Sequence, residues 1–584
     1  MPAKAAALPR PGSGVPARRA FGGAPGWSVL VLAGTALMVA APLASLVITA
    51  LSGDPGLGSR IASSVLPAAL LETALLLGGV AILCGAIGVG TAWLVTAHRF
   101  PGRASLAWLL PLPLAVPTYI TAYVYVELFD AAGPVQSGLR ALTGWRSPAE
   151  YWFPEVRSLP GCILVMSAVL YPYVYAAARA MFVTQSACML EVARTLGAGR
   201  FELFRTVALP LARPALAIGL SLALLEALND IGASEYLGVR TLTVSVYTTW
   251  LNRGSLAGAA QVACAMLAIV IALIALERRA RHHRRYAIST RRPRMTQPAP
   301  LPRGLGWIAA VACAVPVLLG FMLPAGFLLR ESLSRGLLAQ LDAVFVGHLV
   351  TTLALAAAAT AGALLLGVVV VTASRLAQRA LTSAMGFVVG LGYAVPGTVL
   401  ALGLLAPLLA VDGLLNSIWR ILSGERLGLV LMGSGAAVVI AYVIRFLPIA
   451  TGSLSAGLSR VAGGVEDAAR TLGAKPRELV LRIQLPLLRP ALASAALLVF
   501  VDCLKELPAT LLLRPLNVET LATLVYGHAA RGSFEDGALA ALIIVLVGLG
   551  PVMHLTRSAD RMQPEAAGRA LDPNLSATAV GGSP

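Results

Sequence analysis

One stretch of this chain occurs twice, and the repeat restricts the folds that the chain can adopt. The first copy, residues 191–216, reads EVARTLGAGRFELFRTVALPLARPAL, and the second, residues 467–492, reads DAARTLGAKPRELVLRIQLPLLRPAL. The two copies align without a gap, each residue 276 positions from its counterpart. A repeat held in register over this length predicts two copies of one structural unit.

The repeated stretch has the pattern of two short helices joined by a turn. Between the acid and the Leu-Pro pair, apolar residues fall mostly three or four positions apart, the period of an amphipathic helix. Gly197 and Gly473 interrupt that period. Each glycine is expected to adopt a left-handed conformation, so that a second helix begins at a new angle. Prolines are expected to end that second helix (Pro210, Pro486) and to lie in the first turn of the next membrane span (Pro214, Pro490).

The composition places the chain in a membrane. Of its residues, 58% are hydrophobic and only 12% are charged, which excludes an ordinary soluble globular protein. The formal charge is +18, but in such a chain basic residues mark cytoplasmic loops rather than nucleic-acid binding. No Gly-Lys-Ser/Thr sequence is present to hold a nucleotide phosphate, so the chain is not expected to hydrolyse ATP or to bind a cofactor. The cysteines lie in apolar runs without metal or redox spacing: Cys84, Cys162, Cys188, Cys264, Cys313 and Cys503.

Twelve apolar stretches are long enough to cross roughly 30 Å of hydrocarbon. They are residues 27–51, 66–97, 104–128, 160–182, 212–231 and 257–277 in the first half, and 306–329, 346–373, 380–409, 429–450, 489–507 and 537–556 in the second. The first has no convincing cleavage site and is therefore expected to be an uncleaved span. Because each half has an even number of spans, the halves should be parallel repeats related by a pseudo-twofold axis along the membrane normal. The predicted fold class is an all-α polytopic membrane protein of two six-helix repeats.

Polar segments divide the chain into five parts. Residues 1–25 and 557–584 are expected to be disordered cytoplasmic tails, and residues 26–277 and 306–556 to be two membrane domains. Residues 278–305 form a basic linker with nine arginines, which places the linker and both termini in the cytoplasm by the positive-inside rule. A flexible tether is the favoured interpretation of the linker, with a polyanion-binding segment as the alternative.

Two further sequences recur between the halves. Ala-Val-Pro occurs at residues 115–117 and 394–396, and Arg-Gly-Ser at residues 253–255 and 531–533. A proline inside a span marks either a bent helix that lines a pore or a tolerated kink, and the sequence leaves both open.

The repeated stretch resembles the EAA loop of ABC importer permeases. The matching residues are Glu191, Ala193, Gly197, Leu209 and Pro210 in the first copy, and Asp467, Ala468, Ala469, Gly473, Leu485 and Pro486 in the second. Val192 and Asp467 depart mildly from the family pattern. In that family the loop is a cytoplasmic coupling helix that lies in a groove of a separate ATPase subunit. The resemblance implies a type I importer permease of the inner membrane that works with two ATPase copies and a periplasmic binding protein.

Acidic residues align again after each repeat, Glu226 with Asp502 and Asp230 with Glu506. A charged group inside a bilayer costs about 2.5 to 3.5 kcal/mol, so it normally faces a cavity or a partner. These four acids, with Lys505, are the candidate substrate path; no metal ligands are assigned firmly. The alternative is structural: Asp502 or Glu506 pairs with Lys505 or caps a helix, and the acids hold the two halves together.

The segments around these acids, residues 226–234 and 502–510, are similar to the two-domain permeases of ferric-iron ABC importers. A path lined by carboxylates suits a hard cation that prefers oxygen ligands. The same architecture is shared by permeases for thiamine, polyamines or phosphonates. A channel or secondary transporter that needs no ATPase is the alternative from another class, and it leaves the paired loops unexplained.

Overall fold

The computed structural model describes residues 26–53, 61–184, 195, 197, 199–282, 298–376, 379–459, 465, 468–469, 471–474 and 478–568. The expected N-terminal tail, the middle of the basic linker and the last part of the C-terminal tail lie outside these residues. The described chain is almost entirely helical, with one two-residue parallel strand pair between the halves, His98–Arg99 with Ala299–Pro300.

The elements of the first half are α1 (Gly26–Leu51), η1 (Ile61–Val65), α3 (Leu66–Ala97), β1 (His98–Arg99), α4 (Arg103–Leu109), η2 (Leu112–Ala115), α5 (Thr118–Phe129), α6 (Pro134–Thr143), η3 (Pro148–Glu150), α7 (Leu159–Thr184), α9 (Arg200–Leu203), η4 (Phe204–Ala208), α10 (Leu209–Asn229), α11 (Gly232–Tyr236), α12 (Leu242–Leu251) and α13 (Leu256–His282).

Those of the second half are β2 (Ala299–Pro300), α14 (Arg303–Val317), η5 (Leu318–Met322), α15 (Leu323–Ser334), η6 (Leu337–Gln340), α16 (Ala343–Leu376), α17 (Arg379–Ala394), α18 (Gly397–Ser423), α19 (Ala436–Ser459), η7 (Leu479–Gln484), α22 (Leu485–Leu487), α23 (Arg489–Lys505), α24 (Pro508–Leu513), α25 (Leu521–Ala530), η8 (Phe534–Gly537) and α26 (Ala538–Gly568).

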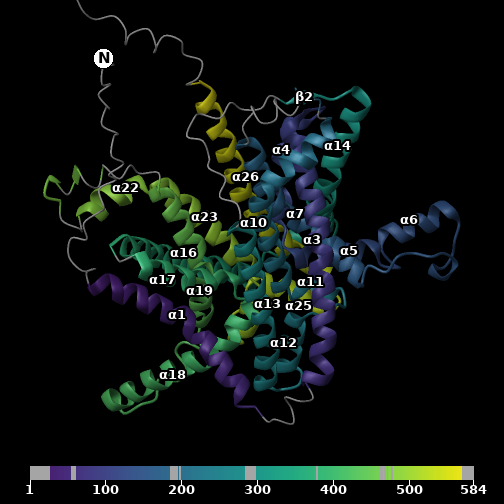
Figure 1. Cartoon of the computed structure of the whole chain (residues 1–584). Helices are drawn as coiled ribbons and strands as arrows, with labels where there is room; N and C mark the ends of the chain where they lie inside the picture. The colour runs from purple at the N-terminus through teal and green to yellow at the C-terminus, as the bar shows by residue number, and fades with distance from the viewer. Residues whose placement is uncertain are drawn as a thin grey trace, which may run out of the picture.

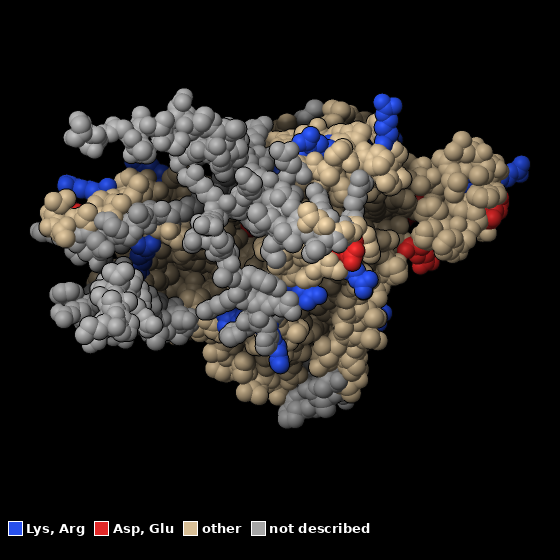
Figure 2. Space-filling model, turned by 45° about the horizontal axis from the view of Figure 1, so that its top comes forward, with Lys and Arg blue, Asp and Glu red and all other residues tan. Residues whose placement is uncertain are grey.

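The helices have the lengths and composition of membrane spans. Among the described residues, ten helices can cross a bilayer, or up to twelve if each of two bent pairs counts as one span. Large apolar side chains such as Leu30, Ile82 and Leu365 are exposed on their outer surfaces, which are mainly uncharged in Figure 2. An apolar exterior of this kind faces lipid, as the composition predicts.

The repeated Ala-Val-Pro sequences break two of the expected spans. In the first half, the segment of α4 and η2 meets the segment of α5 and α6 at an angle of 94°, and Pro117 lies between them. In the second half, Pro396 separates α17 from α18. Both prolines have extended backbone (ψ 143° and 145°) and precede a new helix, so they are not kinks within one helix. The expected spans 104–128 and 380–409 are therefore not continuous helices but are broken at Pro117 and Pro396, because a proline there lacks the N–H that a continuing helix needs.

One other span boundary differs from the sequence prediction, and the helix of the last span continues beyond that span. The expected span 429–450 begins only at Ala436, because residues 424–435 turn back along α18. At the other end of the chain, α26 continues through the expected tail to Gly568. Its last turns include Met562, Gln563 and Glu565, residue types with good helix propensity.

Equivalent contacts recur in the two halves. The backbone N–H of Leu242 donates to the Thr73 hydroxyl at 3.0 Å, and that of Leu521 donates to the Thr352 hydroxyl at 2.9 Å. Each member of the first pair lies 279 positions before its counterpart. The Arg-Gly-Ser repeats are likewise matched turns, in which Gly254 and Gly532 have φ of +66° and +74°. These matched contacts agree with two copies of one unit.

The first span of each half packs against the other half. Helix α1 lies along α16, α17 and α18, and the segment α14–η5–α15 lies along α3, α4 and α5 (Figure 1). Helices α1 and α18 approach each other closely because Gly403 of α18 faces α1. A Cβ on Gly403 would lie 2.2 Å from the carbonyl oxygen of Pro42. Small residues that let backbones approach are typical of helix packing in membranes.

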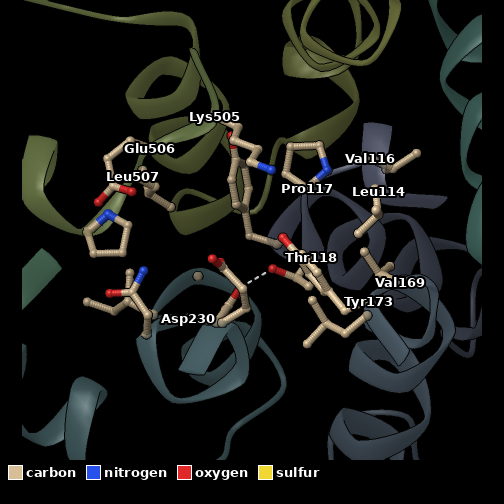
Figure 3. A pocket seen from close by; sticks show the side chains of 17 residues that line it. Leu114, Val116, Pro117, Thr118, Val169, Tyr173, Asp230, Lys505, Glu506 and Leu507 are labelled. Atoms are coloured by element: carbon tan, nitrogen blue, oxygen red, sulfur yellow. Dashed lines mark hydrogen bonds between the residues drawn. The ribbon is translucent and has the colours of Figure 1, made fainter. Parts of the chain in front are cut away.

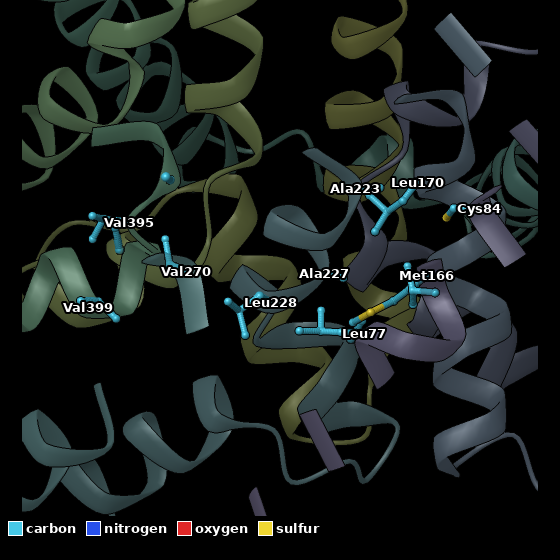
Figure 4. Close-up of a cluster of buried hydrophobic side chains, with 14 of the residues drawn as sticks. Leu77, Cys84, Met166, Leu170, Ala223, Ala227, Leu228, Val270, Val395 and Val399 are labelled. Carbon is cyan, nitrogen blue, oxygen red and sulfur yellow. The ribbon is translucent and has the colours of Figure 1, made fainter. Parts of the chain in front are cut away.

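A single buried apolar cluster continues across the halves. Figure 4 shows Leu77, Met166 and Ala227 of the first half in the same cluster as Val395 and Val399 of the second. Cysteines of the described chain are free and buried or half-buried in this packing, as the sequence predicts. The halves therefore share a core, and a polar cavity lies at their junction.

Candidate functional site

Two equivalent breaks in the helices form the centre of the molecule. Helix α10 ends at Asn229 and α11 begins at Gly232, and in the second half α23 ends at Lys505 and α24 begins at Pro508. Each break contains an acidic residue with extended backbone, Asp230 in the first half and Glu506 in the second. Asp230 accepts a hydrogen bond from the backbone N–H of Ala233 at 2.7 Å, and Glu506 accepts one from that of Ala509 at 3.2 Å. Each carboxylate thus caps the short helix that follows it.

A cavity of about 70 Å³ lies between the two breaks (Figure 3). Its walls come from both halves: α5 and α7 with the first break, and the second break opposite. Among the described residues that line it, the ionisable acids and bases are Glu226, Asp230, Lys505 and Glu506. Three carboxylates therefore face one ammonium group. Val116 and Pro117 also line the cavity, so the bent span of the first half is a wall of it.

The two acids in the breaks have different partners. Asp230 accepts a hydrogen bond from the hydroxyl of Thr118 at the start of α5 (Figure 3). The equivalent position in the second half is Gly397, where a Cβ would lie 2.6 Å from Oε1 of Glu506. Glycine leaves room for that longer side chain, whose other oxygen, Oε2, lies 3.2 Å from Nε of Arg445. Arg445 and Glu506 form a buried ion pair, with 3% and 6% of their side chains exposed.

Arg445 also connects the ion pair to the first half. Its Nη1 donates to the carbonyl of Val395 at 3.1 Å and to Oδ1 of Asn229 at 3.4 Å. Asn229 Oδ1 also accepts from the backbone N–H of Gly397 at 2.6 Å. These bonds join the end of α10 to the breaks in the other half. Sequence reasoning missed both residues, although Arg445 is the only charged residue in the apolar run 429–450, a signal that could have found it.

The other two aligned acids, Glu226 and Asp502, also have different surroundings. Glu226 lines the cavity and accepts a hydrogen bond from the hydroxyl of Tyr393 in the other half, at 2.6 Å. Asp502, its aligned counterpart, is not among the cavity residues and lies 2.8 Å from the ammonium of Lys505. Of the five residues assigned to the substrate path, the structure brings four together around the cavity. Asp502 is paired with Lys505, as expected if its role is structural.

The candidate coupling loops are described only in part. Glu191, Ala193 and Asp467 lie outside the described residues. Gly197 and Gly473 have φ of +86° and +84°, the left-handed conformation predicted for both. Ala468 and Ala469 belong to a helical turn, and their carbonyls accept from the N–H groups of Leu472 and Ala474 at 3.0 Å.

The prolines that follow the loops act differently from the prediction in the first half. There the helix continues through Pro210 and Pro214 as part of α10. The preceding π-helical segment η4 explains this, because Leu209 N–H bonds to the carbonyl of Phe204, five residues back. The wider turn accommodates a proline that would clash in a regular helix.

In the second half the chain does bend after the equivalent proline. The bend measures 67° and lies at Leu488, two residues after Pro486. Pro490 then lies in the first turn of α23, as predicted. The two loops therefore join their spans at different angles although their sequences align.

Paired helical repeats with apolar outer surfaces, broken around a central polar cavity, define a membrane permease. Residues 82–282 and 363–549, more than half of the chain, match the family model for the inner membrane component of binding-protein-dependent transport systems. The chain belongs to this family, and each half carries one copy of its domain. The resemblance seen in the repeated loop is confirmed.

Curated relatives include permeases for several substrates. The Fe(3+)-transport system permease protein FbpB 2 of Haemophilus influenzae is 24% identical over 506 residues, which cover 84% of this chain and 90% of the relative. The molybdenum transport system permease protein ModB of Escherichia coli is 31% identical over 195 residues, 32% of this chain and 81% of that protein. The sulfate transport system permease protein CysW of Escherichia coli is 35% identical over 146 residues, 25% of this chain and 47% of that protein.

Proposed function

We propose that the chain is the permease of an ATP-driven importer that carries ferric iron delivered by a periplasmic binding protein. The charge of the central cavity carries this proposal. Glu226, Asp230 and Glu506 face it with Lys505 as the one cation among its described lining residues. Net negative potential attracts a cation and opposes an oxyanion, and carboxylate oxygens suit a hard metal ion. The full-length similarity to a permease named for Fe(3+) supports the same substrate.

Molybdate or sulfate is the second candidate, because permeases named for both are similar to parts of the chain. An oxyanion path would use positive groups. Here Lys505 pairs with Asp502 at 2.8 Å, and Arg445 pairs with Glu506 at 3.2 Å. Each of these two cations is thus matched by one carboxylate, while the carboxylates of Glu226 and Asp230 also line the cavity, which favours a cationic substrate over an oxyanion.

The substrate is tested by uptake. The permease, with its cognate ATPase and binding protein, is expressed in a host that lacks its own ferric importers. Radiolabelled ferric iron, molybdate, sulfate, phosphonate, thiamine and spermidine are then compared. We expect uptake of iron alone, abolished by ATP depletion. Uptake of another substrate in its place would overturn the assignment, and uptake that survives ATP depletion but collapses with the ion gradient would identify a secondary transporter.

Glu226 and Asp502 provide a matched pair of variants. Glu226→Gln changes a carboxylate that lines the cavity, whereas Asp502→Asn changes the aligned carboxylate that does not. We expect the first variant to lose most iron uptake at unchanged thermal stability, because it weakens the potential in the path. The second should mainly lower stability, since Lys505 loses its partner. Equal uptake by both variants and the native protein would remove these acids from the path.

The partner ATPase is expected to bind at the two coupling loops, one copy for each. Near each loop a large apolar side chain is exposed: Phe201 in the first half and Leu472, at 88%, in the second. A groove of the ATPase would bury such side chains. We expect two ATPase copies per permease chain by native mass spectrometry. Phe201→Ala and Leu472→Ala should weaken this assembly, while Leu365→Ala on the outer face of a span should not; an unchanged assembly would count against these contacts.

A further inference from the structure

Two projections extend sideways from the bundle. The first arm consists of α6 and the return segment 144–158; the second arm consists of the end of α18 from Leu409 and the return segment 424–435. Figure 1 shows α6 at the right and the end of α18 at the lower left, each pointing away from the other helices. Because each arm connects the two spans before a coupling loop, both arms lie on the membrane side opposite those loops.

Polar groups hold the second arm together from within. Asp412 is fully buried and accepts hydrogen bonds from three successive backbone N–H groups, those of Val430, Leu431 and Met432, at 3.1, 2.8 and 3.0 Å. Asn416 accepts from the N–H of Gly428 at 2.9 Å. The return segment is therefore fixed along α18 by its backbone.

The first arm is built in the same way from other residues. Gln136 donates to the carbonyl of Phe129 at 2.8 Å and accepts from the hydroxyl of Tyr151 at 2.7 Å. Arg140 donates to Tyr151 at 2.9 Å and to the carbonyl of Ala131 at 2.7 Å. Its polar groups also point inward.

Large apolar side chains are exposed on both arms at equivalent positions. Leu142 and Ile421, 279 positions apart, are 89% and 83% exposed. Val135 and Leu414, again 279 apart, are exposed as well. The first arm appears in Figure 2 as the mainly uncharged lobe at the right. Large exposed apolar side chains around a buried polar framework are unusual for a loop in water, since each exposed apolar Å² costs roughly 25 cal/mol there.

The length of α18 gives an independent argument. Helix α17 has 16 residues before the break and α18 has 27 after it. These correspond to roughly 24 and 40 Å, whereas the hydrocarbon core is about 30 Å thick. If α18 followed the membrane normal, much of its apolar length would stand in water. The helix therefore runs at an inclination to the membrane normal, and one exposed apolar stripe follows it along the arm: Val411, Leu414, Ile418 and Ile421.

We propose that both arms lie in the lipid interface of the leaflet opposite the coupling loops, with Leu142 and Ile421 among the acyl chains. The arms continue the lipid-facing surface of the spans, and the interfacial depth suits their aromatic residues: Trp145, which stacks on Tyr151, and Trp419. The arms then hold α18 at a fixed depth in the membrane, together with α5, which borders the central cavity. A docked binding protein or a second copy of the chain would be the competing occupant of these surfaces.

Spin labels test this placement in the full chain, reconstituted in nanodiscs of phosphatidylethanolamine and phosphatidylglycerol. Labels are attached to Leu142→Cys and Ile421→Cys, with Val135→Cys and Leu414→Cys as second positions. Glu155→Cys and Glu425→Cys, in the polar turns, are the matched controls, and the unsubstituted protein gives the background from native cysteines. Collision rates with oxygen, which concentrates in lipid, are compared with those of a water-soluble nickel chelate.

We expect the apolar positions to collide severalfold more with oxygen than with nickel, and the control positions to show the opposite preference. All substituted side chains are exposed, so no buried contact is lost; elution as a single species checks the fold. Nickel collisions at Leu142→Cys and Ile421→Cys as frequent as at the controls would place the arms in water. Shielding from both reagents would show that protein covers them. Either result would overturn the proposal.

Discussion

Aligned residues at the centre of this permease have taken different partners. The acid in the first break, Asp230, bonds to the hydroxyl of Thr118, while Glu506 occupies the room left by Gly397 and pairs with Arg445. The counterpart of Arg445 in the first half, 276 positions earlier, is Val169, which cannot form such a pair. Alignment of the two halves locates both acids but cannot assign their partners, because the partners come from other helices and differ between the halves.

The buried ion pair leads to a prediction about stability. Arg445→Met should lower the free energy of unfolding by about 3 to 5 kcal/mol, because Glu506 would keep a buried charge without its cation. Adding Glu506→Gln should restore much of the loss, since the amide carries no charge and its oxygen can still accept from Ala509. Thermal unfolding in detergent measures both variants.

Lys505→Met is the control for this experiment. It breaks a pair whose side chains are 25% and 20% exposed, so that water can solvate the remaining carboxylate. Its loss of stability should be smaller than that of Arg445→Met. A variant of Arg445 as stable as the native protein would contradict a stabilising role for the buried pair.

At the scale of helices, local sequence predicts where elements begin and turn more reliably than where they point. The left-handed glycines, most span positions and the repeat were predictable, since periodicity and glycine chemistry act within a few residues. The direction of α18 was not predictable from the sequence. It depends on the break at Pro396, on Asp412 binding a segment 18 to 20 residues away, and on the lipid boundary. Pro210 was predicted to end a helix. The helix continues because the π-helical turn before it leaves room for the proline.

The coupling loops give a prediction that depends on backbone conformation alone. A Cβ on Gly197 or Gly473 would meet no atom within 4 Å, so substitution causes no clash. Both have positive φ, which costs a residue with a side chain roughly 1 to 2 kcal/mol. Gly197→Val and Gly473→Val should therefore leave insertion intact and lower the amount of substrate transported per ATP hydrolysed.

Gly199→Val is the matched control, because Gly199 has equal space and no positive φ. It should keep native coupling. If all three valine variants transport alike, the turn conformation is irrelevant to coupling. If only the two loop variants fail to insert into the membrane, the glycines serve folding instead.

For the whole molecule, the first span of each half packs against the other half, and polar contacts at the centre join the halves as well. Tyr247 and Tyr526, 279 positions apart, place their hydroxyls 3.3 Å from each other, so their contact lies on the pseudo-twofold axis. Tyr526 also donates to Glu235 of the first half at 2.7 Å. Both elements, α12 and α25, are helices, so no strand pairing joins them in the described chain.

Such a contact on the axis should open when the halves separate, because packed interfaces switch between discrete arrangements. Tyr247→Cys and Tyr526→Cys, combined and joined by a short cleavable bis-maleimide, should stop substrate uptake, and cleavage of the linker should restore it. Each single variant treated with the same reagent is the control, and the native cysteines contribute equally to all samples. Full transport by the joined protein would show that this contact does not move during the cycle, and the separation of the halves would then have to occur elsewhere along their interface.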